Sequence, residues 1–220
     1  MLKSTVQKIL RHLAMRYGKF ADLYTKFCNP SSEEYTEFLS RHGNLYAIGS
    51  NSSILPCTVF TDPADVGIGN NVHFSSCMIG HDGSIAMLKQ GYNIKLDAVG
   101  KIDIRDNVFI GYGAIILPNV TLSSNAIVAV GAVVSNDVAE GDIVAGVPAR
   151  PIGRVEDLVK KLLAQTQRLP WADLINCREG GFDPAIEPQL VELRVSHFYG
   201  NTLTSTVARS GAWPQPTFNK

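Results

Sequence analysis

The sequence has little charge for its length and lacks a long apolar run. Only 18% of its 220 residues are charged, and 20 Lys plus Arg balance 20 Asp plus Glu, so the formal net charge is zero. This balance provides no basic excess for nucleic acid, and a hydrophobic content of 45% is too high for a disordered chain. No segment approaches the roughly 18 apolar residues of a membrane-spanning helix, and Lys8, Arg11 and Arg16 interrupt the N-terminus where a signal peptide would be apolar. We therefore expect a globular, cytoplasmic protein.

Cysteine is also scarce. The four cysteines lie far apart at Cys28, Cys57, Cys77 and Cys177, and no two form a CxxC pair. Such spacing indicates neither a zinc site nor a disulfide framework. We expect reduced thiols and no bound metal.

Residues 1–44 are predicted to form an N-terminal helical segment. Apolar residues spaced mostly three and four apart predict an amphipathic helix over residues 2–27: Leu2, Val6, Ile9, Leu10, Leu13, Tyr17, Phe20, Tyr24 and Phe27. The other face is basic, with Lys3, Lys8, Arg11, Arg16, Lys19 and Lys26 against a single Asp22. That face can contact an anionic membrane surface or a phosphate-bearing substrate, or it can be the solvated side of a helix docked to the protein or a neighbouring subunit. After Asn29-Pro30, Ser31 or Ser32 is suited to cap a second short helix.

An internal repeat begins near residue 45. Large aliphatic residues recur every six positions at Ile104, Ile110, Ile116, Leu122, Val128 and Val134, and a smaller one follows each after four positions at Val108, Ala114, Val120, Ala126, Ala132 and Val138. A period of six fits neither a simple strand nor a helix. Each hexad predicts one short strand and a turn, and three hexads close a triangular coil of about 18 residues in a stacked solenoid. We therefore expect a β-helix over residues 45–154.

Two regions interrupt or follow this repeat. The hexads lapse over residues 81–101, which are predicted to loop out of the coil, and long loops on rigid scaffolds often carry function. Residues 155–220 are predicted to be a C-terminal helix and an extended tail. Val155, Leu158 and Leu162 mark a helix that covers the open end of the solenoid, and the last dozen residues are expected to be loose.

The repeat resembles that of a known superfamily. The stretches Ile104-Arg-Asp-Asn-Val-Phe-Ile-Gly-Tyr-Gly, Ala129-Val-Gly-Ala-Val-Val and Ala145-Gly-Val-Pro-Ala-Arg-Pro-Ile resemble the signature shared by maltose, galactoside, xenobiotic and sugar O-acetyltransferases. These are hexapeptide-repeat acyltransferases. The resemblance implies a mainly β fold, a left-handed parallel β-helix with N-terminal and C-terminal α-helical segments. The maltose enzymes have a His-Pro pair where this sequence has His81-Asp82-Gly83-Ser84. This segment resembles the corresponding one in acetyltransferases of surface-polysaccharide and capsule biosynthesis.

This resemblance implies that His81 is the general base. Only His73 and His81 of the five histidines lie in the solenoid, and histidine suits proton transfer because its ordinary pKa lies near neutrality. Asp82 is the predicted catalytic partner that orients His81, with a role in forming the turn as the alternative. Asp97 and Asp103 at the far end of the loop are weaker candidates.

The resemblance also implies acetyl-CoA as acyl donor, bound along a seam between subunits of a homotrimer. The predicted contacts are Gly111, Tyr112, Gly113, Ala129, Gly131 and Ser135, with Arg150 and Arg154 toward the nucleotide phosphates. Small residues let a ligand approach the backbone, although turns of the repeat need glycine in any case.

The predicted function is acetyl-CoA-dependent O-acetylation of a sugar hydroxyl in polysaccharide biosynthesis, with a carbohydrate as acceptor. An N-acetyltransferase of an amino sugar or nucleotide sugar is an alternative, and a non-catalytic solenoid that binds a partner is another. A carbonic anhydrase on the same solenoid needs three zinc-binding histidines, which His73 and His81 alone do not supply.

Overall fold

The computed structural model describes residues 2–200, with side chains from residue 5 onward. The residues predicted to be loose at the C-terminus lie outside this range. The chain divides into two compact units, Met1–Leu158 and Val159–Lys220. The N-terminal helices therefore share a unit with the solenoid.

Three helices precede the solenoid: α1 (Leu2–Tyr17), α2 (Ala21–Cys28) and α3 (Ser32–His42). The prediction of one helix over residues 2–27 is wrong, because the chain turns between α1 and α2. Gly18 adopts φ 65°, and its N–H donates to the Ala14 carbonyl at 2.8 Å, a common way to end a helix. The predicted cap of α3 is confirmed at Ser31, whose hydroxyl accepts from the Glu34 N–H at 3.2 Å.

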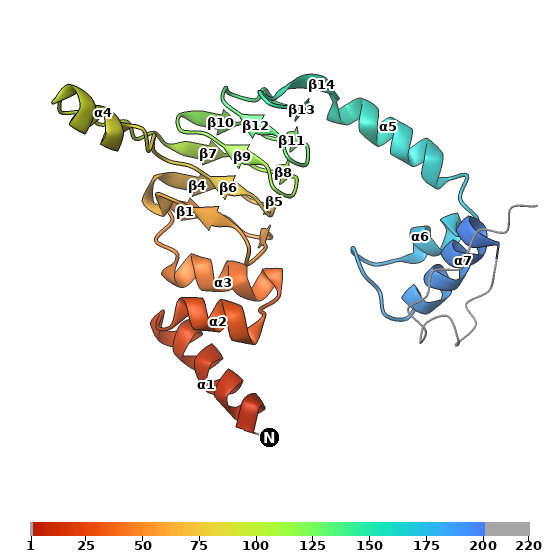
Figure 1. Cartoon of the computed structure of the whole chain (residues 1–220). Helices are drawn as coiled ribbons and strands as arrows, with labels where there is room; N and C mark the ends of the chain where they lie inside the picture. Colours follow the sequence, from red (N-terminus) through yellow and green to blue (C-terminus); the bar gives the residue numbers. More distant parts are fainter. Residues whose placement is uncertain (1, 201–220) are drawn as a thin grey trace, which may run out of the picture. The chain divides into compact units, whose positions relative to one another are not determined.

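The solenoid consists of three sheets that we call A, B and C (Figure 1). Sheet A contains β1 (Ala47–Ile48), β4 (Val66–Ile68), β7 (Ile102–Ile104) and β10 (Val120–Leu122). Sheet B contains β2 (Ser53–Ile54), β5 (His73–Phe74), β8 (Phe109–Ile110), β11 (Ile127–Val128), β13 (Asp142–Ala145) and β14 (Arg150–Arg154). Sheet C contains β3 (Val59–Phe60), β6 (Cys77–Met78), β9 (Ile115–Ile116) and β12 (Val133–Val134). Neighbouring strands pair in parallel, except for the final antiparallel pair β13–β14.

The hexad positions form the core of this prism. Ile104, Ile110 and Ile116 come from sheets A, B and C in turn, and each is at most 1% exposed. The smaller residues that follow them, such as Ala114 and Ala132, are fully buried. The predicted fold class, a left-handed parallel β-helix with helical segments at both ends, is confirmed. Figure 1 shows α3 against the first coil, where the Ile54 N–H donates to the Thr36 hydroxyl at 2.8 Å.

Asparagines stack along the corner between sheets A and B. The Asn71 side-chain amide donates to the Asn107 side-chain oxygen at 2.9 Å, and the Asn107 amide donates to the Asn125 oxygen at 3.2 Å. All three adopt φ between 53° and 59°, a left-handed conformation that asparagine tolerates better than most residues. This asparagine ladder supports three successive coils.

The segment over residues 81–101 leaves the coil as predicted and contains a short helix, α4 (Ile85–Tyr92), that the sequence did not indicate. Its two ends meet at a narrow neck. The Gly100 N–H donates to the Gly80 carbonyl at 2.8 Å, and His81 bridges Val99 in antiparallel fashion. His81 therefore sits where the excursion begins.

The C-terminal region contains α5 (Val155–Thr166), which was predicted, followed by two further helices. These are α6 (Ala172–Cys177) and α7 (Glu187–Tyr199). The expectation of an extended tail is wrong for these residues, because Trp171 and Leu190 are buried. No helix among the described residues is long and apolar enough to cross a membrane.

Candidate active site

The candidate base lies at the corner between sheets C and A. Strand β3 pairs with β6 so that Phe60 lies opposite Met78, and this register carries Asp62 to the level of Gly80 in the next coil. His81 follows directly. Its Nδ1 lies 2.6 Å from Asp62 Oδ2, and because a carboxylate only accepts, Nδ1–H is the donor. The other ring nitrogen, Nε2, makes no hydrogen bond within the described part of the chain.

The Asp62 carboxylate is itself held by neighbours. The Thr61 hydroxyl donates to Asp62 Oδ2 at 2.7 Å, and the Gly80 N–H donates to the Thr61 oxygen at 2.9 Å. The hydrogen bond from Thr61, followed by that from His81, holds the pKa of the Asp62 carboxyl below its ordinary value. Asp62 is therefore charged at neutral pH and fixes one tautomer of His81.

Gly80 makes the close approach of Asp62 possible. A Cβ atom at position 80 would lie 2.7 Å from the Asp62 Cβ and 2.8 Å from Asp62 Oδ2. Any larger residue would force the Asp62 side chain to move. The glycine is thus a positioning residue for the His81–Asp62 pair.

The predicted partner Asp82 is not brought to the Nδ1 atom of His81. Its carboxylate accepts from the Ser84 N–H at 2.9 Å, and this bond is the largest cause that lowers the pKa of the Asp82 carboxyl. This contact corresponds to the alternative role in forming the turn. Asp97 binds the N–H of Ala98. Asp103 pairs with Arg105 at 2.8 Å.

Sequence reasoning missed Asp62 because it considered only neighbours in the chain and in the loop. The signal was present in the hexad phase, which places residues one coil apart side by side. In the earlier coils Ile48, Ile54, Phe60 and Val66 are six apart, but Ile68 follows Val66 after only two positions, and this break obscured the register. His73, the other histidine of the solenoid, lies outward on sheet B and contacts the Asn71 side chain at 2.9 Å.

The predicted donor residues lie mostly on the opposite edge of sheet C, at a corner we call the glycine corner. It contains Gly111, Tyr112, Gly113, Ala129 and Gly131, which connect sheet B to sheet C in two successive coils. Gly113 and Gly131 both adopt φ 69°, and a Cβ atom built on either meets nothing within 4 Å. Gly113 and Gly131 expose backbone there, as the narrow arm of a coenzyme A thioester needs, whereas a Cβ atom at Gly111 would lie 2.5 Å from the Val130 nitrogen, so packing requires that glycine.

The remaining predicted donor residues lie elsewhere. Ser135 is exposed just after β12, on the same edge as His81. Arg150 is exposed, and its guanidinium donates to the Ala149 carbonyl at 2.9 Å. Arg154 forms an ion pair with Asp142, so its guanidinium already has an anionic partner. Arg150 is thus the less committed of the two arginines.

A single chain does not bring the glycine corner and His81 together. Ser75 lies at the glycine corner in the same coil as His81, because its carbonyl accepts from the Gly113 N–H at 2.9 Å. Six extended residues from Ser75 to His81 span roughly 15 Å or more. The two edges therefore face different directions on one prism.

A cavity of about 680 Å³ lies over sheet A; its lining begins at Asp65 and Lys101, toward the His81 corner, and does not include His81 or Asp62. Gly67 and Ala47 line it, with Tyr46, Asp65, Lys101, Asp103 and Arg105 among the polar lining residues. The Tyr46 side chain is 80% exposed. No cluster of three or more histidine, cysteine or carboxylate side chains suited to a metal occurs among residues 5–200.

Comparisons with known proteins point to acetyltransferases. No family model matches the chain. It is 36% identical over 105 residues to a protein of Schizosaccharomyces pombe that is named, provisionally, as an acetyltransferase, with 46% of this chain and 48% of that protein covered. It is 39% identical over 79 residues to a 2,3,4,5-tetrahydropyridine-2,6-dicarboxylate N-acetyltransferase of Staphylococcus aureus, with 34% and 33% covered. The chain thus spans half or less of the length of these two relatives.

Among solved structures, a galactoside acetyltransferase in complex with coenzyme A is similar to this chain. The sequences are 20% identical, the match covers 72% of this chain and 83% of that one, and the TM-score is 0.45. The predicted resemblance to acetyltransferases is confirmed by the curated relatives.

Proposed function

We propose that this chain is an acetyl-CoA-dependent O-acetyltransferase that acts on a sugar hydroxyl in surface-polysaccharide or capsule biosynthesis. The observation that carries the proposal is the 2.6 Å hydrogen bond between His81 Nδ1 and Asp62, which leaves Nε2 as the nitrogen able to accept a proton. The names of the curated relatives support acetyl transfer. The proposed site of action is the cytoplasm, with the protein free or at a membrane surface.

His81 acts as the general base. When bound, acetyl-CoA supplies a thioester whose carbonyl carbon forms the new C–O bond while its C–S bond breaks. His81 Nε2 takes the proton from the acceptor hydroxyl and then returns it to the departing sulfur. Asp62 is a positioning residue that fixes the tautomer and stabilises the protonated ring.

The acceptor occupies the cavity beside this corner. Asp65 and Asp103 offer carboxylate oxygens to sugar hydroxyls, and the exposed Tyr46 ring offers a flat surface for a sugar ring. Lys101 and Arg105 offer donors at the same cavity. Seven of the fourteen lining residues are polar or charged, so a sugar would find hydrogen-bond partners beside apolar surface.

The complete site is formed by two copies of the chain within a homotrimer. The glycine corner of one copy would hold the donor against the His81 edge of the next. This arrangement accounts for small residues on one edge of sheet C and titratable residues on the other. A closed ring of three such contacts leaves no edge unmatched.

N-acetylation is the second candidate, and one observation favours it: the Staphylococcus aureus relative is named an N-acetyltransferase. An amine acceptor at neutral pH is largely protonated and also needs a base, so His81 would serve either reaction. The product separates the two, because alkaline hydroxylamine cleaves an acetyl ester and spares an amide.

The test is release of free thiol from acetyl-CoA with a panel of hydroxyl sugars and amino sugars. We expect acceptor-dependent release with a hydroxyl sugar, a product labile to hydroxylamine, and loss of turnover in His81→Ala. A hydroxylamine-stable product would establish N-acetylation instead. Equal turnover in the wild type and His81→Ala would refute the proposed base, and the absence of both turnover and coenzyme A binding would refute the enzyme.

A further inference from the structure

The N-terminal hairpin, defined as residues 2–28 with α1 and α2, exposes large apolar side chains at helical spacing. On α1 these are Val6, Ile9 and Tyr17, and on α2 and the turn before it they are Phe20, Leu23 and Phe27. Each is between 42% and 54% exposed. Residues three, four or seven apart share one face of a helix, so each helix presents an apolar stripe to solvent.

These stripes are not the faces by which the hairpin packs. Ala14 on α1 and Tyr24 and Cys28 on α2 are buried instead. The two helices are also joined by a hydrogen bond from the Gln7 side chain to the Phe27 carbonyl at 2.7 Å. The hairpin therefore packs these residues against each other and against α3, where the Tyr24 and Phe38 rings lie 5.5 Å apart, and leaves the stripes without a partner in the described structure.

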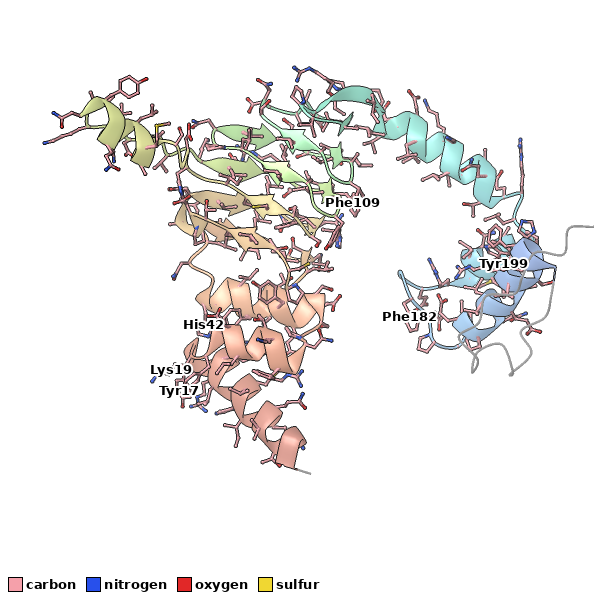
Figure 2. All side chains as sticks on the ribbon, viewed as in Figure 1. Tyr17, Lys19, His42, Phe109, Phe182 and Tyr199 are labelled. Atoms are coloured by element: carbon pink, nitrogen blue, oxygen red, sulfur yellow. The ribbon has the colours of Figure 1, made fainter. Side chains whose placement is uncertain are left out.

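Basic residues lie next to the stripes. Lys8, Arg16, Lys19 and Lys26 are exposed and form no ion pair within the described residues, whereas Arg11 pairs with Glu34 at 2.7 Å. The Arg16 guanidinium lies 5.5 Å from the centre of the Tyr17 ring, and the Lys26 ammonium lies 6.0 Å from that of Phe27. Figure 2 shows Tyr17 and Lys19 projecting from the same side of this segment.

The charge of the hairpin differs from that of the rest of the chain. Six basic residues and one acidic residue give residues 1–28 a net charge of +5, so the remainder carries −5. Phe20 adds a local irregularity, because this bulky residue adopts φ 61° and still exposes its ring. An exposed aromatic ring that follows a lysine, as Phe20 follows Lys19, is typical of a membrane interface.

We propose that the N-terminal hairpin docks on the surface of an anionic lipid bilayer. Such a surface takes up both features at once, because the acyl boundary accepts the apolar stripes and the headgroups attract the cations. A nucleic acid or a free phosphate would use the cations alone. A second hairpin would bring +5 against +5 and be repelled. This inference does not depend on the acetyl-transfer reaction.

The test is co-sedimentation of the full chain with vesicles of phosphatidylcholine alone and of an equimolar mixture of phosphatidylcholine and phosphatidylglycerol. We expect binding to the anionic vesicles only, weakened when salt rises from about 0.1 M to about 0.5 M. Each cation contributes about fivefold to the affinity, so Lys8→Glu with Lys19→Glu should lower it by about 25-fold or more. Ile9→Ser with Phe27→Ser should lower it by at least about tenfold at unchanged charge.

Matched controls come from exposed residues of α4 and of the segment that follows it. Lys89→Glu with Lys95→Glu and Met87→Ser with Tyr92→Ser make the same kinds of change there and should leave vesicle binding unchanged. Three results would overturn the proposal: no binding to anionic vesicles, equal loss in the control variants, or hairpin variants that change the oligomeric state measured by light scattering without changing vesicle binding. The last result would assign the stripes to a second copy of the chain.

Discussion

The two edges of sheet C differ in kind. The edge toward sheet A carries the titratable pair His81 and Asp62, joined at 2.6 Å, whereas the edge toward sheet B carries Gly113 and Gly131 with open space beside them. The first edge offers a general base but no open backbone for a ligand, and the second offers open backbone but no base. In the proposed trimer the solenoid divides its chemistry between these two edges, and neighbouring copies combine them.

The largest effect should come from the titratable edge. His81→Ala removes the base and should lower kcat/KM by at least about 100-fold. His73→Ala is the matched control, because this histidine lies on sheet B and the one hydrogen bond of its ring within the described residues is to Asn71. Steady-state thiol release measures both variants, and an equal loss in the two would refute the assignment of the base to one edge.

Asp62→Asn should have the next largest effect. It keeps the shape and removes the charge that orients His81, so kcat should fall by about tenfold or more. The hydrogen bond from Thr61, followed by that from His81, lowers the pKa of the Asp62 carboxyl. The difference in kcat between wild type and variant should therefore persist above that lowered pKa and vanish as the pH falls through it.

The control for that change is Asp82→Asn, because Asp82 binds the Ser84 N–H and not His81. Its pH–rate profile should follow the wild type closely. A larger loss in Asp82→Asn than in Asp62→Asn would show that the sequence-predicted partner orients the base after all.

The glycine corner should respond differently. Gly113→Asn with Gly131→Asn adds side chains where the structure has open space, and asparagine tolerates the φ of 69°. We expect KM for acetyl-CoA to rise by about tenfold, with kcat changed less. Gly180→Asn, at φ 70° in the other unit, is the matched control. A fall in kcat at constant KM would contradict a donor-binding role.

The smallest effect concerns the asparagine ladder between sheets A and B, whose side chains take no part in the proposed chemistry. Asn107→Ala removes two ladder hydrogen bonds and places alanine at φ 58°, so the free energy of unfolding should fall by about 1–3 kcal/mol. Asn107→Gly removes the same bonds without the backbone strain and should cost less. Thermal unfolding measures both, and activity per folded protein should not change.

The sequence predicted the solenoid well because the six-residue spacing alone indicates which residues of each hexad are buried. Ile104, Ile110 and Ile116 needed no distant information to be placed inward, and the lapse over residues 81–101 followed from the same count. Features that depend on distant partners were missed. The register between Phe60 and Met78 decides that Asp62 meets His81, and the break in the six-residue spacing between Val66 and Ile68 hides that register in the sequence.

The helical regions show the same limit. The apolar spacing over residues 2–27 continues through Gly18, so periodicity alone does not reveal the turn between α1 and α2. In the C-terminal unit, α6 and α7 depend on packing around Trp171 and Leu190 rather than on a clear period. Local patterns predicted elements, and tertiary contacts decided where they end.

The most direct test of the account is activity in mixed trimers of His81→Ala and the Gly113→Asn/Gly131→Asn variant. Each variant alone should be impaired, the first in turnover and the second in donor binding at low acetyl-CoA. If neighbouring copies share each site, random mixing should pair an intact His81 edge with an intact glycine corner in about one quarter of the sites and restore activity accordingly. Mixtures no more active than the average of the two separate variants would show that each site lies within one chain and would contradict the account.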